Sequence, residues 1–325
     1  MTRRSVIAGI VTVSRILLLA ALLLMLGVMA GTSITLAADV SITGLVRNGT
    51  TGQPVADEMI TLVFIGPQGP EGIGQTRSDA DGRFAFRGLS DGRYLLQASH
   101  QGVSYAAHAV VSGAPVDLVV QVFDVSDRVP LRVALLGMAV DVQPGYVRIS
   151  EVVHLQNPTS QTFLGPVAFP LPRGARFITF SEGLYQPRVE GAQILDRLIV
   201  RPGAHQVAYG YSVAGSGEVA LDRRVPLPVE RLELFTSAPA EVRSPRLQPL
   251  PTVTNEGQTY TRASGRALPP GDLTMSVVGV PAVRTWLAPA AAGTLAGLLI
   301  IGLMWAIARE GRTRPGGVAL GVQNR

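Results

Sequence analysis

The chain has 325 residues, no cysteine and a formal net charge of +5. Without cysteine, disulfides, thiolate metal sites and a cysteine nucleophile are excluded. Three arginines and no acid lie in residues 1–38, four arginines and one acid lie in residues 309–325, and residues 39–284 have a net charge of −1. The excess of basic residues therefore lies in the two terminal segments. Because the central part is nearly neutral, the basic balance does not favour nucleic acid as a partner.

The N-terminal segment has the layout of a secretory signal. A basic stretch up to Arg15 precedes the apolar run Ile16–Ala38, whose last third is rich in small residues. This order predicts a signal peptide over residues 1–38, cleaved after Ala30, Ala37 or Ala38. The alternative is an uncleaved anchor, because the run is long enough to span a bilayer.

Residues 39–125 show short alternating segments separated by turn residues, which is typical of a β-sandwich. In one of them Phe84 and Phe86 share a face, and in another Tyr94, Leu96 and Ala98 do. We expect seven strands here: Val40–Val46, Met59–Ile65, Ile73–Arg77, Arg83–Arg87, Arg93–His100, Val103–Val110 and Val116–Phe123.

Five sequence stretches in this half carry a family resemblance: Gly44–Val46, Gly52–Val55, Ile60–Leu62, Thr76–Phe86 and Leu89–Leu96. In order and spacing, residues 40–125 resemble the carboxypeptidase-regulatory-like domain, a transthyretin-like β-sandwich. The resemblance implies a non-catalytic module that accompanies other domains for interaction or folding. Glu58 departs from the pattern, because the family usually has a small residue there.

Residues 126–284 continue in the β style, and we predict a second β-sandwich that is immunoglobulin-like or related. Pro-rich joints separate its candidate strands and mark loops and edges, because proline avoids central strand positions. Along one candidate strand, Val147, Ile149, Val153 and Leu155 alternate, with Glu151 interrupting the apolar face. The candidate strands are Leu131–Val142, Tyr146–Leu155, Arg176–Phe180, Ile194–Val200, Gln206–Val213, Glu218–Arg224, Arg231–Thr236, Gln258–Arg262 and Leu273–Val278.

The uncharged run Thr285–Ala308 has 24 residues and is followed by arginines, which predicts a transmembrane helix over residues 285–308. Small residues recur along it at a spacing of four and could let another helix pack closely; the helix-packing candidates are Ala292, Gly293, Ala296 and Gly297. The alternative is that alanine and glycine are simply common in membrane helices. Residues 309–325 are predicted to be a short cytoplasmic tail.

We find no motif that predicts a catalytic, cofactor-binding or metal-binding site. The histidines have no metal-ligand spacing, although His100 and His108 lie on adjacent predicted strands and could meet. The carboxylate pairs Asp57/Glu58 and Glu230/Glu233 are interpreted as solvated strand residues rather than acid–base pairs. Arg223 and Arg224 are expected at the rim or against lipid phosphates.

The sequence thus predicts an all-β ectodomain of two tandem sandwiches, outside the cytoplasm of a bacterial cell, on a single-pass anchor with a cytoplasmic C-terminus. The hypothesis we favour is a non-enzymatic binding or scaffold protein, whose partners are the lipid bilayer and an envelope or membrane protein. One alternative is an accessory subunit or assembly factor of a membrane complex, for example in respiration or cytochrome maturation. Another is a hydrolase of envelope glycans or peptides, which needs convergent acids in residues 126–280.

Overall fold

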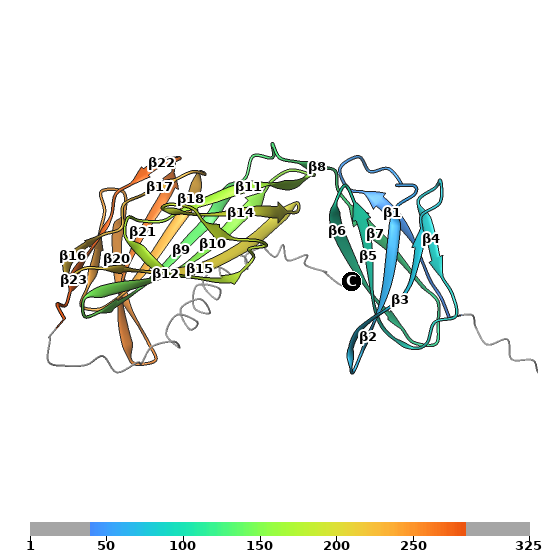
Figure 1. Ribbon diagram of the computed structural model, residues 1–325, viewed down its shortest axis with the longest axis horizontal. Helices are drawn as coiled ribbons and strands as arrows, with labels where there is room; N and C mark the ends of the chain where they lie inside the picture. The colour runs from blue at the N-terminus through green and yellow to red at the C-terminus, as the bar shows by residue number, and fades with distance from the viewer. Residues whose placement is uncertain (1–39, 284–325) are drawn as a thin grey trace, which may run out of the picture.

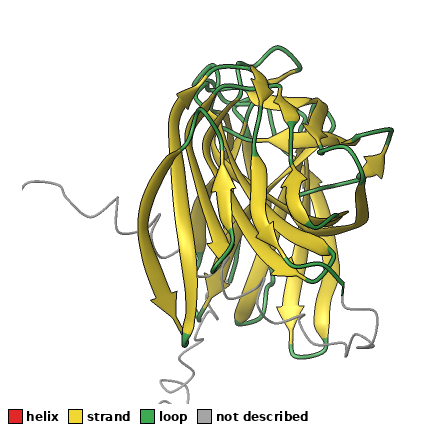
Figure 2. Cartoon of the chain, turned by 90° about the vertical axis from the view of Figure 1, so that its left-hand side faces the viewer, coloured by secondary structure: helices red, strands yellow, loops and turns green. Residues whose placement is uncertain are grey.

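The computed structural model describes residues 40–283. All regular structure in this range is β-strand (Figure 2), which confirms the predicted all-β class. Within the same range no helix is long and apolar enough to cross a bilayer. The predicted signal peptide, the predicted membrane helix with Ala292, Gly293, Ala296 and Gly297, and the predicted tail lie outside the described residues.

The first seven strands form a two-layered sandwich, which we call the first module. Its three-stranded sheet has the order β4-β1-β7, and its four-stranded sheet has the order β3-β2-β5-β6. Every predicted strand of this half is present, with ends that differ by a few residues. The strands are β1 (Ile42–Asn48), β2 (Met59–Gly66), β3 (Gly69–Arg77), β4 (Arg83–Phe86), β5 (Gly92–His100), β6 (Val103–Val111) and β7 (Val116–Val122).

The core of the first module follows from the alternation of its strands. Phe84 and Phe86 both point inward from β4, and Tyr94, Leu96 and Ala98 point inward from β5. The two sheets bury these side chains between them, and such burial contributes about 1.5–3 kcal/mol for each large apolar side chain. The sandwich therefore has an apolar core of its own.

The remaining strands form the second module, which is built around a seven-stranded sheet with the order β12-β15-β10-β9-β18-β21-β20. Smaller sheets, β13-β14-β11-β8, β16-β23-β19 and β17-β22, pack against it. Its strands are β8 (Val125–Ser126), β9 (Arg132–Gln143), β10 (Tyr146–Asn157), β11 (Thr162–Pro170), β12 (Ala175–Glu182), β13 (Arg188–Val189), β14 (Gln193–Val200), β15 (Gly203–Ala214), β16 (Gly217–Ala220), β17 (Arg223–Val225), β18 (Val229–Ser237), β19 (Glu241–Arg243), β20 (Gln248–Asn255), β21 (Gln258–Leu268), β22 (Gly271–Leu273) and β23 (Ser276–Val280).

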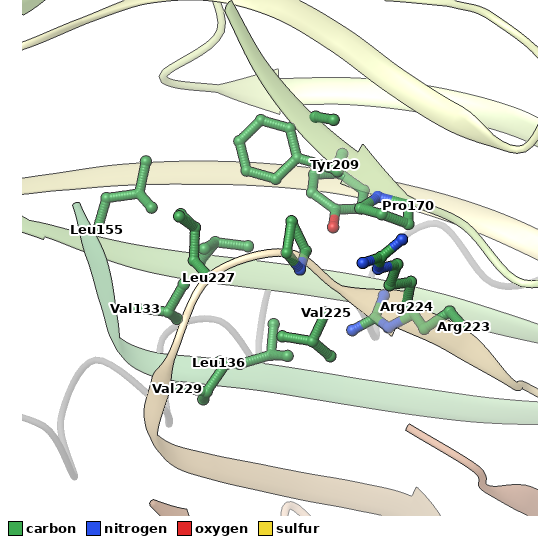
Figure 3. Close-up of a pocket in the computed structure, with 14 residues that line it drawn as sticks. Val133, Leu136, Leu155, Pro170, Tyr209, Arg223, Arg224, Val225, Leu227 and Val229 are labelled. Atoms are coloured by element: carbon green, nitrogen blue, oxygen red, sulfur yellow. The ribbon is translucent and has the colours of Figure 1, made fainter. Parts of the chain in front are cut away.

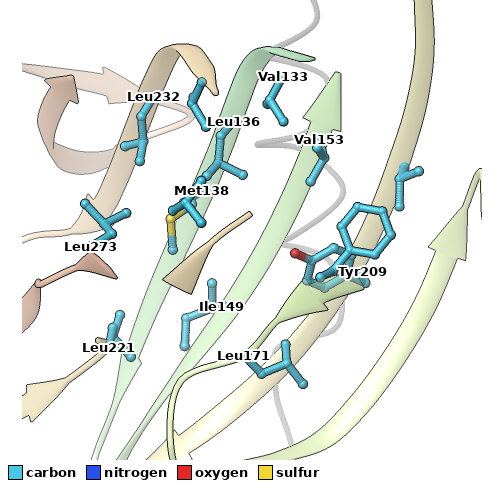
Figure 4. Packing of buried hydrophobic residues seen from close by; sticks show 14 of the residues in the cluster. Val133, Leu136, Met138, Ile149, Val153, Leu171, Tyr209, Leu221, Leu232 and Leu273 are labelled. Atoms are coloured by element: carbon cyan, nitrogen blue, oxygen red, sulfur yellow. The ribbon is translucent and has the colours of Figure 1, made fainter. Parts of the chain in front are cut away.

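One large apolar cluster fills the space between these layers. Met138 on β9, Ile149 and Val153 on β10, and Leu232 on β18 come from the large sheet. Leu171, Leu221 and Leu273 approach from the other layer, as Figure 4 shows. This cluster is separate from the core of the first module. The second module is therefore a second packing unit along the same chain.

The two modules meet at β8, which follows β7 after two residues (Figure 1). β8 pairs in parallel with the start of β11, at Thr162 and Phe163. β1 and β7 end at this junction, so the first described residues lie at the far end of the first module. The last ones lie at the far end of the second module, where the N–H of Gly145 donates to the carbonyl of Pro281 at 2.8 Å.

Candidate functional site

A buried charge lies in the middle of the second module. Glu151 points inward from β10 and is completely buried. Its Oε1 accepts a hydrogen bond from the guanidinium of Arg223 on β17 and one from the hydroxyl of Tyr211 at 2.5 Å. Its Oε2 accepts a hydrogen bond from the hydroxyl of Tyr209 at 2.9 Å. The cluster of these four side chains joins the large sheet to the opposite layer.

Burial and charge shift the pKa values in this cluster. Burial raises the pKa of Tyr209 and Tyr211 well above the usual value, and the negative charge of Glu151 raises it further. Burial alone would lower the pKa of Arg223, but the attraction of Glu151 and the contributions of Tyr211 and Tyr209 together outweigh it, and the pKa is raised. Both tyrosines thus stay protonated and donate to the carboxylate, and the arginine stays charged.

The prediction that Arg223 lies at the rim or against lipid is wrong, because only 4% of its side chain is exposed. The signal that points to the cluster was present in the sequence. Glu151 interrupts an inward-facing apolar row, and a buried carboxylate needs partners. The partner residues lie 58, 60 and 72 positions away along the chain, so pattern alone does not identify them.

Beside Arg223 is a small pocket with a volume of about 40 Å³. Figure 3 shows Arg223, Arg224 and Tyr209 on one side of it and apolar residues such as Val133, Leu155 and Val229 on the other. An engineered cavity of roughly 150 Å³ holds benzene. The pocket is much smaller than that cavity.

A second polar cluster lies at the end of the first module that meets the second module. His100 is at the end of β5, and its Nδ1 is 2.6 Å from Oε1 of Glu58. Its Nε2 is 3.5 Å from Oδ1 of Asp124 and has no hydrogen-bond partner among the described residues. Asp124 also accepts from Nδ2 of Asn48 at 2.7 Å. Glu58, the departure from the family pattern, is thus accommodated by a histidine.

The contact between the modules is made by side chains from both. The hydroxyl of Tyr105 on β6 is hydrogen-bonded to the carbonyl of Phe123 and to Oγ1 of Thr162, both at 2.9 Å. Arg201 donates to the carbonyl of Ser104 at 2.6 Å, and its guanidinium lies over the Tyr105 ring, 5.5 Å from the centroid.

Further contacts bind the linker and the loops beside it. The hydroxyl of Thr50 donates to the carbonyl of Ser160 at 2.5 Å, and the N–H of Val125 donates to Oε1 of Gln101 at 2.8 Å. Leu164 and Ile199 of the second module pack against the core cluster of the first. The junction thus combines hydrogen bonds, a cation–π contact and apolar packing.

The other predicted candidates do not come together. His100 is buried, whereas His108 is exposed opposite Leu95, so the two imidazoles lie on opposite faces of one sheet. Residues 40–283 contain no group of three or more histidine, aspartate or glutamate side chains placed to hold a metal ion.

The carboxylate pairs named from the sequence are engaged with basic partners. Asp57 contacts Arg77 at 3.1 Å, and Glu58 contacts His100. Glu230 contacts Arg132 at 3.1 Å, and Glu233 contacts Arg231 at 3.4 Å. Each of these acids is thus half of an ion pair or hydrogen-bonded pair.

The comparison with protein families confirms the resemblance found in the sequence. Residues 41–123 match the model of the carboxypeptidase regulatory-like domain. The first module is therefore a carboxypeptidase regulatory-like domain. No curated protein matches the chain.

Solved structures resemble parts of the chain weakly. The pilus 2b backbone protein of group B streptococcus has 16% sequence identity and a TM-score of 0.21, over 26% of this chain and 41% of that one. The M1 zinc metallopeptidase of Deinococcus radiodurans has 10% identity and a TM-score of 0.31, over 46% of this chain and 42% of that one. The major pilin subunit of Bacillus cereus has 12% identity and a TM-score of 0.22, over 73% and 87%.

This chain thus spans less than half the length of the streptococcal protein and of the metallopeptidase. TM-scores this low define no common fold for the whole chain.

Proposed function

We propose that the protein is a non-enzymatic, membrane-anchored scaffold of the bacterial cell envelope. It holds its regulatory-like first module at a fixed angle to the second module. The observation that carries the proposal is the junction between the modules. Tyr105 and Arg201 bind across it, and the linker itself becomes β8 of the second module. A chain that only tethered two independent domains would need neither contact.

The anchoring part of the proposal is supported by the sequence. The run Thr285–Ala308 follows the last described residue closely, and Arg309, Arg312 and Arg314 come directly after it. This arrangement favours a helix with its C-terminal end in the cytoplasm and both modules outside. Protease added to spheroplasts should then trim the modules and leave a short membrane-bound fragment. A chain that stays intact while a control periplasmic protein is degraded would contradict the topology.

A distance measurement tests the fixed angle. Because the chain has no cysteine, Val119→Cys and Val189→Cys place one spin label on an exposed site of each module. Double electron–electron resonance spectroscopy on the full chain in lipid should give one narrow distribution of the distance between the two labels. Arg201→Ala should broaden it, whereas Arg128→Ala, at an arginine whose side chain is 94% exposed, should not. A broad distribution in the otherwise unchanged chain would refute a rigid scaffold.

A second function, accessory subunit of a membrane complex, is favoured by one sequence feature. In the predicted membrane helix, the spacing of Ala292, Gly293, Ala296 and Gly297 would let another helix pack closely. Crosslinking in native membranes should then capture a membrane protein, and Gly293→Leu with Gly297→Leu should abolish the crosslink. Unchanged crosslinking would remove this candidate and leave the scaffold proposal in place.

A further inference from the structure

One end of the second module is the exit end, where the described chain stops. Pro281 is hydrogen-bonded to Gly145 in the β9–β10 turn. The cross-strand row from Val147 to Val213 to Ala175 places the start of β12 at this same end. Only residues 281–284 separate β23 from the predicted membrane helix, and four residues reach at most about 14 Å. The exit end and the start of β12 are therefore both close to the expected membrane surface.

The start of β12 has the composition of a membrane-surface contact. Arg173 and Arg176 are exposed, and no acid occurs between Arg173 and Ser181. Phe177 is 82% exposed and has a φ of 52°, which is in the left-handed region that a bulky side chain rarely adopts. Arginine and exposed aromatic side chains together suit an anionic headgroup layer.

Charge at the exit end is unevenly distributed. Away from β12, the same end holds Glu218 on β16, Glu241 on β19 and Glu256 in the β20–β21 turn, together with Arg243. Anionic lipid repels these acids and attracts Arg173 and Arg176 at the start of β12. The asymmetry favours a tilt of the module toward β12.

The edge formed by β12 is poorly suited to a protein strand. Its pairing with β15 shifts register between Arg176 and Thr179 and again between Phe180 and Glu182. Bulges of this kind twist an edge strand away from regular pairing, so strand addition by a peptide or a second copy is disfavoured. Lipid is thus a better partner than another strand for the start of β12.

We propose that Arg173, Arg176 and Phe177 form a lipid-contact corner through which the second module rests on the bilayer, with the arginines at anionic headgroups and the phenylalanine below them. The inference rests on the proposed membrane anchor. The short tether supports it, because it keeps the corner at a high effective concentration of lipid, so that a weak contact stays populated.

A depth measurement tests the proposal. The full chain with Phe177→Cys or Val119→Cys, each carrying a nitroxide, is reconstituted into vesicles of phosphatidylcholine with phosphatidylglycerol. Relaxation by oxygen and by a water-soluble nickel complex reports how deep each label lies. We expect a several-fold higher oxygen-to-nickel ratio at 177 than at 119, and a fall toward the ratio at 119 when Arg173→Gln and Arg176→Gln are added.

The outcomes separate the two proposals. Equal, water-like ratios at both positions in a chain that stays with the vesicles would overturn the lipid-contact corner but not the anchor. A chain that washes off the vesicles would contradict the anchor itself. Unchanged circular dichroism would show that the substitutions at these exposed positions leave the fold intact. A contrast that is lost only when Arg173→Gln and Arg176→Gln are added then supports the corner, and a contrast that survives them counts against it.

Discussion

Glu151 places a full charge where its neighbours along the strand, Ile149 and Val153, are core residues. Desolvating a carboxylate and a guanidinium costs several kcal/mol for each ion, and their attraction offsets this only when the geometry is good and other hydrogen bonds are made. Here Tyr209 and Tyr211 supply those hydrogen bonds. We expect the cluster to favour the observed position of β17, because an arginine at another position would leave the carboxylate unpaired.

Removing one partner of this cluster should therefore be severe. We expect Glu151→Ala to lower the free energy of unfolding by about 3–5 kcal/mol, because it leaves Arg223 buried without a counter-charge. The double variant Glu151→Leu with Arg223→Met should lose much less. Chemical denaturation checks both, with Glu230→Gln at an exposed pair as the control. A loss for Glu151→Ala no larger than for Glu230→Gln would contradict the buried-charge account.

The two buried tyrosines predict a loss of stability in alkali. Their pKa values are raised in the fold, whereas tyrosines of the unfolded chain ionise near pH 10. The stability they contribute is complete below that pH and is lost as the pH rises above it, by about 1.4 kcal/mol per pH unit for each tyrosine. Denaturation above pH ~10 should show a shallower slope for Tyr209→Phe with Tyr211→Phe than for the unchanged chain. Tyr185→Phe, at an exposed tyrosine, should keep the original slope.

At the level of strands, β1 is held between β4 and β7 and has no room for an extra atom at Gly44. A Cβ there would lie 2.4 Å from the carbonyl oxygen of Leu118 and 2.6 Å from Cζ of Phe84. The family-like residues Gly44–Val46 thus have a steric reason in this chain: a small residue lets the sheet and the Phe84 ring approach closely.

Gly44→Ala should accordingly destabilise the first module by about 1–3 kcal/mol, the usual range for overpacking. Gly72→Ala on β3 is the matched control, because a Cβ there meets nothing within 4 Å. Hydrogen exchange of β1 and β7 would show the difference as faster exchange for the Gly44 variant alone. Equal protection in the two variants would show that β1 can move aside.

The strands also show where sequence reasoning succeeds and fails. All seven strands of the first module were predicted, because their alternation and turn residues agree. In the second module β8, β11, β13, β19 and β20 are not among the predicted strands. The predicted strands Glu218–Arg224 and Leu273–Val278 are each divided, into β16 and β17 and into β22 and β23. β11 contains Pro166 and ends at Pro170, and β20 contains Pro249 and Pro251. β20 lies at the edge of its sheet, where a missing N–H costs little.

At the level of the whole molecule, the two core clusters are separate and meet only through junction residues such as Leu164 and Ile199. We expect the effects of Gly44→Ala and Glu151→Ala to add within about 0.5 kcal/mol, because the sites are distant and share no partner. Hydrogen exchange on the double variant would test this. A large non-additive term would show that the junction couples the stabilities of the modules.

The pairing of β8 with β11 has a practical consequence for anyone who wishes to cut the protein in two. The boundary predicted between residues 125 and 126 passes through β8. A fragment ending at residue 125 would therefore leave the second module without Val125, one of the two residues of β8. A fragment for crystallisation or grafting onto another carrier is better ended at Asp124. The downstream fragment should begin at Val125, so that β8 stays complete and remains paired with β11.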